Sequence, residues 1–310
     1  MTRVQKPGGS AGRWGPLFGA RADDWAETGE GPSGYGTPVY EYVLDRAKIG
    51  SETSLLDCGC GAGRFARMAA NRGAKVAGID AAKELVAIAT RWTPEGDFRV
   101  GDLESLPWPD ASFDWVTGFN SFQFADDKAR ALGEARRVSR GPVAVVTPSR
   151  ASESGITSVF KPLLPLFPPE ALEGMKQSGM FALSVPGKLE EVLAAVHLAV
   201  QVDAEIETPI VFDTADAAVR AFLGAGPTAP AIRHSGESAV ASAVRDALGP
   251  FTGAQGRVTL PGLVPGRAGS WLKHGPRLLR SVRWSGLLVQ SLNEARVSYE
   301  PRHERQLSLG

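Results

Sequence analysis

Short apolar runs alternate with amphipathic segments across residues 53–148. After the second apolar run, Leu85, Val86 and Ala89 recur at the spacing of one helical face. Regular alternation of this kind predicts strands separated by helices, which is the arrangement that builds a parallel sheet. We therefore expect an α/β fold in the first half of the chain.

The pattern changes after Thr147. Five of the 22 prolines lie between Pro148 and Pro169, with large apolar residues among them. Proline interrupts long helices, so we expect an irregular apolar segment above the strand ends. We interpret 149–182 as a lid over a substrate, with a proline-stiffened surface loop as the alternative.

Helical and extended patterns continue to residue 260. We expect a helix over 186–197, a strand over 200–212, and further helices at 213–223 and within 226–251. A last strand begins at 256–260, and the prolines and glycines from Pro261 onward predict that it stops there. The predicted organisation is an N-terminal arm at 1–40, a domain at 41–260 with a helical cap at 149–250, and a basic tail at 261–310.

The most specific local pattern is the sequence LLDCGCGAG at residues 55–63. An apolar strand enters a turn with three alternating glycines, and glycine lets the backbone approach a ligand closely. A dinucleotide fingerprint would require a third glycine at position 64, where this chain has Arg64. The G-K-[ST] of a P-loop is also missing, so the turn is not designed for a β/γ-phosphate.

A second strand, Lys75–Ile79, ends in Asp80, 23 residues after Asp57. An acidic side chain at that strand end can accept hydrogen bonds from both ribose hydroxyls. The N-terminus of the helix after Gly63 should face a carboxylate of the ligand, because its free N–H groups and dipole favour negative charge.

Taken together, the D-x-G-x-G-x-G pattern and its continuation resemble class I S-adenosylmethionine (SAM) dependent methyltransferases. FRVGDL at 98–103 is similar to that family's third strand, and LPWPDASFDWV at 106–116 is similar to its run into the fourth. Residues 131–138 and 142–146 are similar to the helix and strand that follow. The likeness is closest to the ubiquinone/menaquinone C-methyltransferases (methyltransferase type 11).

This resemblance implies a Rossmann-like fold, with a mostly parallel seven-stranded sheet, helices on both faces and a helical cap. It also implies SAM as cofactor. Asp57 would lie near the ammonium end of SAM, Asp80 at the ribose, and Asp102 with Leu103 at the adenine. The full set of expected cofactor-binding residues is Asp57, Gly59, Cys60, Gly61, Gly63, Asp80, Ala81, Asp102, Leu103 and Asn120.

The acceptor side carries weaker signals. Amino-group methylases of nucleic acid have [D/N]-P-P-[Y/F] after the fourth strand, whereas this chain has NSFQF at 120–124. We expect Phe122, Gln123 and Phe124 to line the acceptor pocket, with core packing as the alternative for each phenylalanine. His234, in a predicted cap turn, is the candidate general base, with a surface or capping role as the alternative.

Composition limits the partners. The 34 Lys and Arg balance the 34 Asp and Glu, so we expect no nucleic-acid partner, and no run approaches the eighteen apolar residues of a membrane span. The only cysteines, Cys58 and Cys60, lie in the glycine turn far from the four histidines, so we expect no metal site. Reduced cysteines fit a cytoplasmic enzyme.

The expected reaction is methyl transfer to an O, N or C atom of a small, partly apolar molecule. The cofactor motifs leave two alternatives open. One is a SAM-binding protein that does not methylate, such as a cofactor-assisted cyclase or a regulatory protein. The other is a nucleic-acid or protein methyltransferase recruited by the basic tail. The aromatic-rich arm before residue 40 should fold over the cofactor or form an ordinary surface helix.

Overall fold

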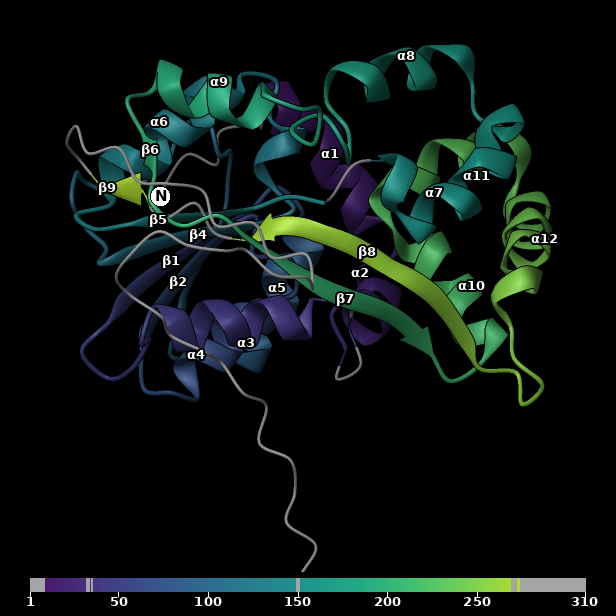
Figure 1. Ribbon diagram of the computed structural model, residues 1–310, viewed down its shortest axis with the longest axis horizontal. Coiled ribbons are helices and arrows are strands. Elements are labelled where there is room, and N and C mark those ends of the chain that lie inside the picture. Colours follow the sequence, from purple (N-terminus) through teal and green to yellow (C-terminus); the bar gives the residue numbers. More distant parts are fainter. Residues whose placement is uncertain (1–8, 32–33, 35, 149–150, 269–271, 274–310) are drawn as a thin grey trace, which may run out of the picture.

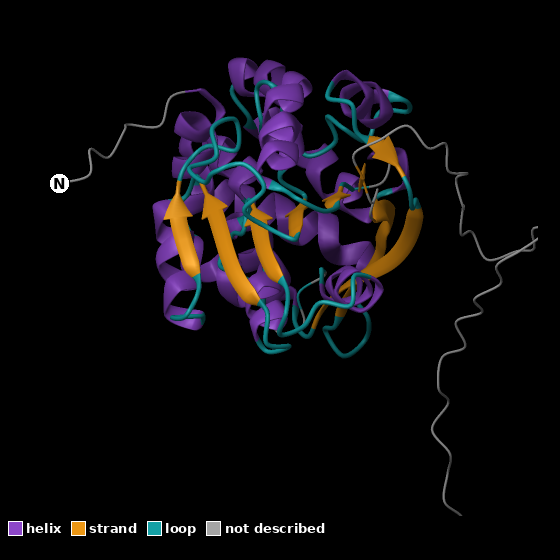
Figure 2. Ribbon diagram, turned by 90° about the vertical axis from the view of Figure 1, so that its left-hand side faces the viewer, coloured by secondary structure: helices purple, strands orange, loops and turns teal. Residues whose placement is uncertain are grey.

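A central sheet organises the computed structural model, which describes residues 9–31, 34, 36–148, 151–268 and 272–273. Its seven strands run in the order β3-β2-β1-β4-β5-β8-β7 (Figures 1 and 2). The first five are parallel, while β8 is antiparallel to both of its neighbours. The mostly parallel seven-stranded sheet is thus confirmed. The strands are β1 (Ser54–Cys58), β2 (Lys75–Asp80), β3 (Asp97–Val100), β4 (Trp115–Phe119), β5 (Val143–Val146), β7 (Ala204–Phe212) and β8 (Val258–Ala268).

Strand β1 lies at the centre of the parallel part. Leu56 of β1 pairs with Ala77 of β2 on one side and with Val116 of β4 on the other. Leu55 and Leu56 are fully buried, which explains why this strand is a continuous apolar run. The carboxyl ends of β1, β2 and β4 therefore meet at one edge of the sheet, where open α/β sheets bind ligands.

Helices cover both faces of the sheet (Figure 1). On one face α6 and α9 pack a core that contains Leu132 and Leu193, and on the other α3 and α4 contribute Leu44 and Phe65. The helices associated with this sheet are α3 (Thr37–Arg46), α4 (Arg64–Ala70), α5 (Lys83–Trp92), α6 (Lys128–Val138) and α9 (Lys188–Ala195).

A second apolar core belongs to a helical cap, drawn to the right of the sheet in Figure 1. Its centre contains Val159, Leu163, Val240 and Val244, all fully buried. The cap and the segments that join it are η3 (Ala151–Glu153), α7 (Gly155–Phe160), η4 (Lys161–Leu166), α8 (Pro169–Gln177), α10 (Ala215–Gly224), η5 (Gly226–Thr228), α11 (Ala229–Ser235), α12 (Glu237–Leu248) and η6 (Gly249–Phe251).

The proline-rich segment differs from the expected irregular loop, because most of it is helical. Pro162 lies in the first turn of η4, and Pro169 is the first residue of α8. Proline is tolerated at these positions because the first N–H groups of a helix have no intrahelical partner. The buried Val159 and Leu163 make this segment part of the cap core, which excludes the surface-loop alternative.

The last strand was expected to end at residue 260, and this was wrong. Strand β8 continues through Pro261 and Pro265 to Ala268, paired with β7. Its register shifts opposite Ile206/Thr208 and again opposite Thr208/Ile210, so each proline falls in an irregularity of the ladder. A bulge leaves one residue unpaired, and proline lacks the N–H that pairing would use.

The expected boundary at 261 therefore falls inside β8. Beyond it, β9 (Leu272–Lys273) pairs with β6 (Ala199–Val200), and residues 274–310 of the predicted tail lie outside the described residues. The helical cap is also smaller than the predicted range 149–250, because α9 packs on the sheet and β7 is one of the strands of the sheet.

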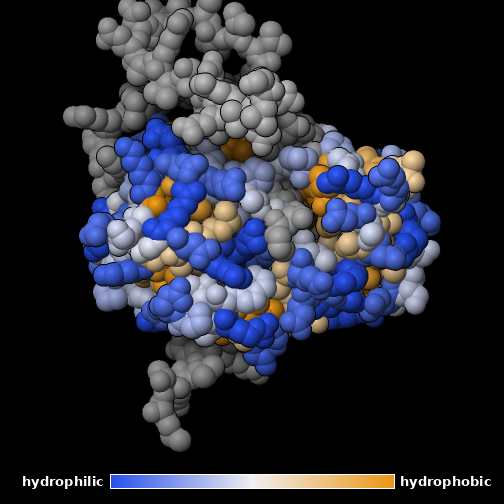
Figure 3. All heavy atoms as spheres, turned by 90° about the horizontal axis from the view of Figure 1, so that it is seen from below, coloured by the Kyte–Doolittle hydropathy of each residue, from blue (hydrophilic) through white to orange (hydrophobic). Residues whose placement is uncertain are grey.

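The face in Figure 3 is mostly hydrophilic with small apolar areas. Within the described ranges, the large apolar side chains that are clearly exposed are Val100, Leu164 and Val185. No helix in this part of the chain has both the length and the apolar character needed to cross a membrane.

Candidate functional site

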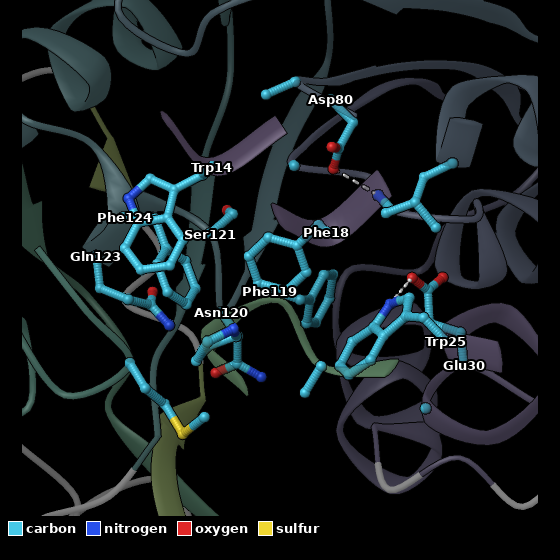
Figure 4. Close-up of a pocket in the computed structure, with 18 of the residues that line it drawn as sticks. Trp14, Phe18, Trp25, Glu30, Asp80, Phe119, Asn120, Ser121, Gln123 and Phe124 are labelled. Atoms are coloured by element: carbon cyan, nitrogen blue, oxygen red, sulfur yellow. Dashed lines mark hydrogen bonds between the residues drawn. The ribbon is translucent and has the colours of Figure 1, made fainter. Parts of the chain in front are cut away.

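One cavity lies between the carboxyl ends of the parallel strands, the N-terminal arm and the cap (Figure 4). Four carboxylates line it: Glu30, Asp57, Asp80 and Asp102. Apolar side chains from the cap line the other part. The cavity thus has an acidic half at the strand ends and an apolar half under the cap.

The glycine turn forms the floor of the acidic half. Gly59, Gly61 and Gly63 have φ angles of +74°, +55° and +84°, a conformation that other residues rarely adopt. A Cβ on Gly61 would also lie 2.0 Å from the Glu30 Oε1 atom. Glycine is therefore required at position 61 by both backbone angle and space.

Asp80 fixes this turn. Its Oδ2 atom accepts a hydrogen bond of 2.9 Å from the Gly61 N–H, and its Oδ1 atom accepts one of 2.9 Å from the Ala82 N–H. Burial raises the pKa of the Asp80 carboxyl against the lowering effect of these bonds. The carboxyl lines the cavity beside Ala81, as predicted from the end of the second strand.

Asp57 lies deeper, with 2% of its surface exposed. Its Oδ1 atom accepts a 2.9 Å hydrogen bond from the Thr117 hydroxyl, which joins β1 to β4. Burial raises the pKa of Asp57 to about 7, and the neighbouring Glu30 and Asp80 carboxyls add to the rise. Asp57 therefore faces the cavity as a weakly acidic group.

Glu30 is the functional candidate that sequence reasoning missed. Its carboxyl accepts hydrogen bonds from the Ala62 N–H at 2.9 Å, the Arg64 N–H at 3.3 Å and the Trp25 indole at 2.7 Å (Figure 4). Burial raises its pKa to about 7 despite these bonds. Glu30 follows a glycine-rich arm without any regular spacing to the turn, so no sequence pattern connected the two.

This contact corrects one prediction. The N-terminus of the helix after Gly63 was expected to face a carboxylate of the ligand. Instead, the N–H groups of Arg64, its first residue, and of Ala62 in the preceding turn donate to Glu30. The physical expectation of a negative group at that helix end holds, with the protein supplying it.

The N-terminal arm lies over the cavity. Its elements are α1 (Gly9–Gly19), α2 (Ala22–Asp24) and η1 (Trp25–Gly29). The rings of Trp14 and Phe18 contact the Phe124 ring, with centroids 4.7 and 5.5 Å apart, and both line the cavity. A Cβ on Gly15 would be 2.5 Å from the Ala81 carbonyl oxygen, so α1 packs directly on the strand end. The arm is therefore a wall of the site, not an ordinary surface helix.

The remaining predicted cofactor residues divide into two groups. Gly59, Cys60, Asp102, Leu103 and Asn120 line the cavity with those described above. Gly63 does not: it precedes α4, and a Cβ there would meet the Ala89 side chain at 2.8 Å. Its glycine is required by helix packing.

Only two of the three predicted acceptor residues lie in the cavity wall. Gln123 and Phe124 line the cavity, whereas Phe122 does not. Phe122 is 1% exposed and belongs to the core under the sheet, where it packs so closely on Gly118 that a Cβ there would be 2.3 Å from its ring. The core-packing alternative is correct for Phe122.

His234 was predicted to lie in a cap turn as the candidate general base, with a surface or capping role as the alternative. It is exposed in the last turn of α11 and is not a residue of the cavity wall. A cap turn of suitable sequence does not determine which way its side chains face, so the pattern could not distinguish the surface from the site.

The apolar half is built by residues far apart in the sequence. From the cap and the β7–β8 side, the side chains facing the cavity include Ile156, Phe160, Met180, Ile210, Phe212 and Phe222. The first three come from the segment interpreted as a lid, so it does contribute to the cavity.

Comparison with known proteins shows which family and fold this chain resembles. Residues 56–143 match the methyltransferase domain family. A crystal structure of the YcgJ protein from Bacillus subtilis aligns with a TM-score of 0.52 at 20% identity, covering 77% of this chain and 99% of that one. A putative methyltransferase from Bacillus halodurans aligns with a TM-score of 0.50 at 15% identity, covering 76% and 99%. These likenesses confirm the Rossmann-like fold.

Two proteins of known name are similar in sequence to part of this chain. A malonyl-[acyl-carrier protein] O-methyltransferase from Serratia marcescens is 37% identical over 102 residues, 33% of this chain and 40% of that protein. A demethylmenaquinone methyltransferase from Thermotoga maritima is 35% identical over 86 residues, 27% of this chain and 38% of that protein. This chain thus spans about two fifths of the length of these relatives. Residues 56–143 therefore match a methyltransferase domain, in agreement with the SAM-dependent class that the motifs resemble.

The walls of the cavity fit the cofactor of that class. SAM carries a sulfonium and an ammonium, and the acidic half presents carboxyl groups. The buried Oδ1 atom of Asn120 also has no hydrogen-bond partner within the described part of the chain. Asn120 directly follows β4 with φ of +51°, a left-handed conformation that asparagine tolerates. A buried polar atom without a protein partner in the cavity wall can be satisfied by a ligand.

Proposed function

We propose that this protein is a SAM-dependent methyltransferase that acts on an O, N or C atom of a small, partly apolar molecule. The observation that carries the proposal is one cavity with an acidic half at the strand ends and an apolar half under the cap. The family match supports the cofactor, and the apolar half supports the acceptor.

In the acidic half, this chain's residues would bind and orient the cofactor. Asp80 would hold the ribose hydroxyls, Asp102 and Leu103 the adenine, and Asp57 the ammonium group. Bound SAM supplies a methyl group that is already activated on its sulfonium. Glu30 would act indirectly, by fixing the glycine turn through the Ala62 and Arg64 N–H groups.

In the apolar half, the rings of the arm and the cap would exclude water and align the acceptor. Phe124 contacts both Trp14 and Phe18, so the arm and the acceptor side form one wall. Alignment of two reactants in a dry site can supply much of the rate enhancement. We assign no general base, because His234 lies outside the cavity.

The direct test incubates the protein with labelled SAM and small-molecule extracts or a panel of small apolar acceptors. Mass spectrometry should detect S-adenosylhomocysteine in step with a product 14 mass units heavier than its acceptor, the mass of one added CH₂. Binding of SAM with no methylated product from any acceptor would favour the non-methylating alternative. Product formed only on RNA, DNA or protein would favour a polymer modifier. We also propose a cytoplasmic location, which the two free cysteines support.

A further inference from the structure

Gln123 is an unusual residue of the acceptor half, because both polar atoms of its side chain are unpaired. Its side chain is fully buried, yet neither its Oε1 nor its Nε2 atom has a hydrogen-bond partner among the residues described. Buried amides in folded proteins are nearly always satisfied, because an unpaired polar group costs about 1–3 kcal/mol. The residue lines the cavity, so the missing partner can come from a ligand.

The acceptor half that Gln123 lines is largely apolar, with Asn120 and Ser121 as polar residues on the same turn. Gln123 follows Asn120 on the turn after β4, on the opposite side of the cavity from Glu30 and Asp80 in Figure 4. Phe124 beside it, and Ile156, Phe160 and Met180 from the cap, supply hydrocarbon, ring and thioether surface. Moving an ionised group from water into such surroundings is strongly unfavourable unless a countercharge is present.

The four carboxylates of the same cavity also disfavour an anionic acceptor. They lie in the cofactor half of the cavity. An anionic acceptor would approach these groups and be repelled. A cationic acceptor would lose its hydration among aromatic and aliphatic side chains, with only the uncharged polar groups of Asn120, Ser121 and Gln123 on the neighbouring turn.

Building on the proposed function, we infer that the acceptor is an uncharged apolar molecule whose hydroxyl or amide group hydrogen-bonds to Gln123. A hydroxyl or amide can donate to Oε1 and accept from Nε2, which would satisfy both unpaired atoms at once. Gln123 is thus a specificity-determining residue that selects one neutral polar group on an apolar body.

The test uses four naphthalene probes with the same ring, added to protein saturated with S-adenosylhomocysteine at pH 7.5. They are 2-naphthol, 2-naphthoate, 2-naphthylmethylammonium and 2-methylnaphthalene, and ligand-observed NMR gives their affinities. We expect 2-naphthol to bind at least about 10-fold more tightly than either charged probe. In Gln123→Leu, 2-naphthol should bind about 10-fold more weakly, because its hydroxyl loses the hydrogen bonds to the amide, while the affinity for 2-methylnaphthalene is unchanged.

Two controls separate this inference from the proposed function. Gln123→Leu should bind S-adenosylhomocysteine like the wild type, which shows that the variant is folded. Gln123→Glu should shift the preference toward the ammonium probe. Equal binding of 2-naphthoate and 2-naphthol, an unchanged ratio in Gln123→Leu, or no binding by any probe would overturn the inference. Failure of the wild type to bind S-adenosylhomocysteine would instead overturn the proposed function.

Discussion

The two halves of the cavity are built differently. Apart from Glu30 of the N-terminal arm, the acidic half comes from three short segments at strand ends, 57–61, 80–81 and 102–103. Backbone N–H groups donate hydrogen bonds to the Asp80 and Asp102 carboxyls. The apolar half gathers residues as distant as Gln123, Ile156 and Phe222, and its amide is unpaired. The first half is set by local sequence and the second by tertiary packing, so the cofactor can be recognised from motifs and the acceptor cannot.

The largest effect should come from the floor of the acidic half. Gly61→Val should weaken SAM binding by more than about 100-fold, because valine is strained at φ +55° and its Cβ would displace the Glu30 carboxyl. Calorimetry measures the affinity, and circular dichroism should show that the fold persists. The matched control is Gly174→Val in α8, where an added Cβ meets nothing within 4 Å. Normal SAM binding by Gly61→Val would show that the turn is not the cofactor floor.

A slightly smaller loss of SAM affinity is expected from substitution of Asp80. Asp80→Ala should weaken SAM binding by about 1–3 kcal/mol, since the ribose hydroxyls lose their acceptor and the Gly61 N–H loses its partner. Asp80→Asn keeps one acceptor oxygen and should lose less. The exposed Glu41→Ala serves as control. If Asp80→Ala titrates like the wild type, the ribose assignment is wrong.

These two positions show what sequence could establish. The turn at 57–63, its following helix and the acidic strand end at Asp80 are consecutive features with fixed spacing, and all lie where predicted. The helix expected at 213–223 is α10, and the Thr214 hydroxyl caps it by accepting a hydrogen bond from the Ala217 N–H. Each of these features depends on a few neighbouring residues.

The rest depends on contacts between distant segments. Glu30 reaches the turn 32 residues away, and nothing near it in sequence marks that contact. Phe122 and Phe124 are two residues apart on one turn, yet one is core and the other lines the cavity. Pro261 and Pro265 lie in β8 because the ladder bulges there, a feature of strand pairing that single-strand patterns do not reveal.

The buried Glu30 carboxyl of the acidic half should make the free energy of unfolding depend on pH. In the folded protein the Glu30 carboxyl keeps its proton up to about pH 7, whereas in the unfolded chain it releases the proton near pH 4.5. Between these values the folded state binds more protons, so this group lowers the free energy of unfolding by about 1.4 kcal/mol per pH unit as pH rises.

Urea unfolding at pH 5 to 8 checks this. Relative to wild type, Glu30→Gln should gain stability as pH rises through this range, by an amount on the order of 3 kcal/mol in all. The exposed Glu41→Gln should run parallel to the wild type. A Glu30→Gln curve that also runs parallel would mean that Glu30 is not buried as described.

The smallest effect is expected at the surface of the cap. His234→Ala should change turnover by less than about 2-fold, because this side chain is exposed and outside the cavity. A general base would contribute about 10²–10⁴-fold. Once an acceptor is known, steady-state turnover rates of the wild type and the variant test this prediction. A 100-fold lower rate in the variant would show that His234 takes part in the reaction.

The central claim is that the strand ends and the glycine turn form a cofactor site, and calorimetric titration of the wild-type protein with SAM tests it most directly. We expect one binding site per chain, with S-adenosylhomocysteine competing for it. Absence of binding heat for both compounds, together with no protection against thermal unfolding, would contradict the account.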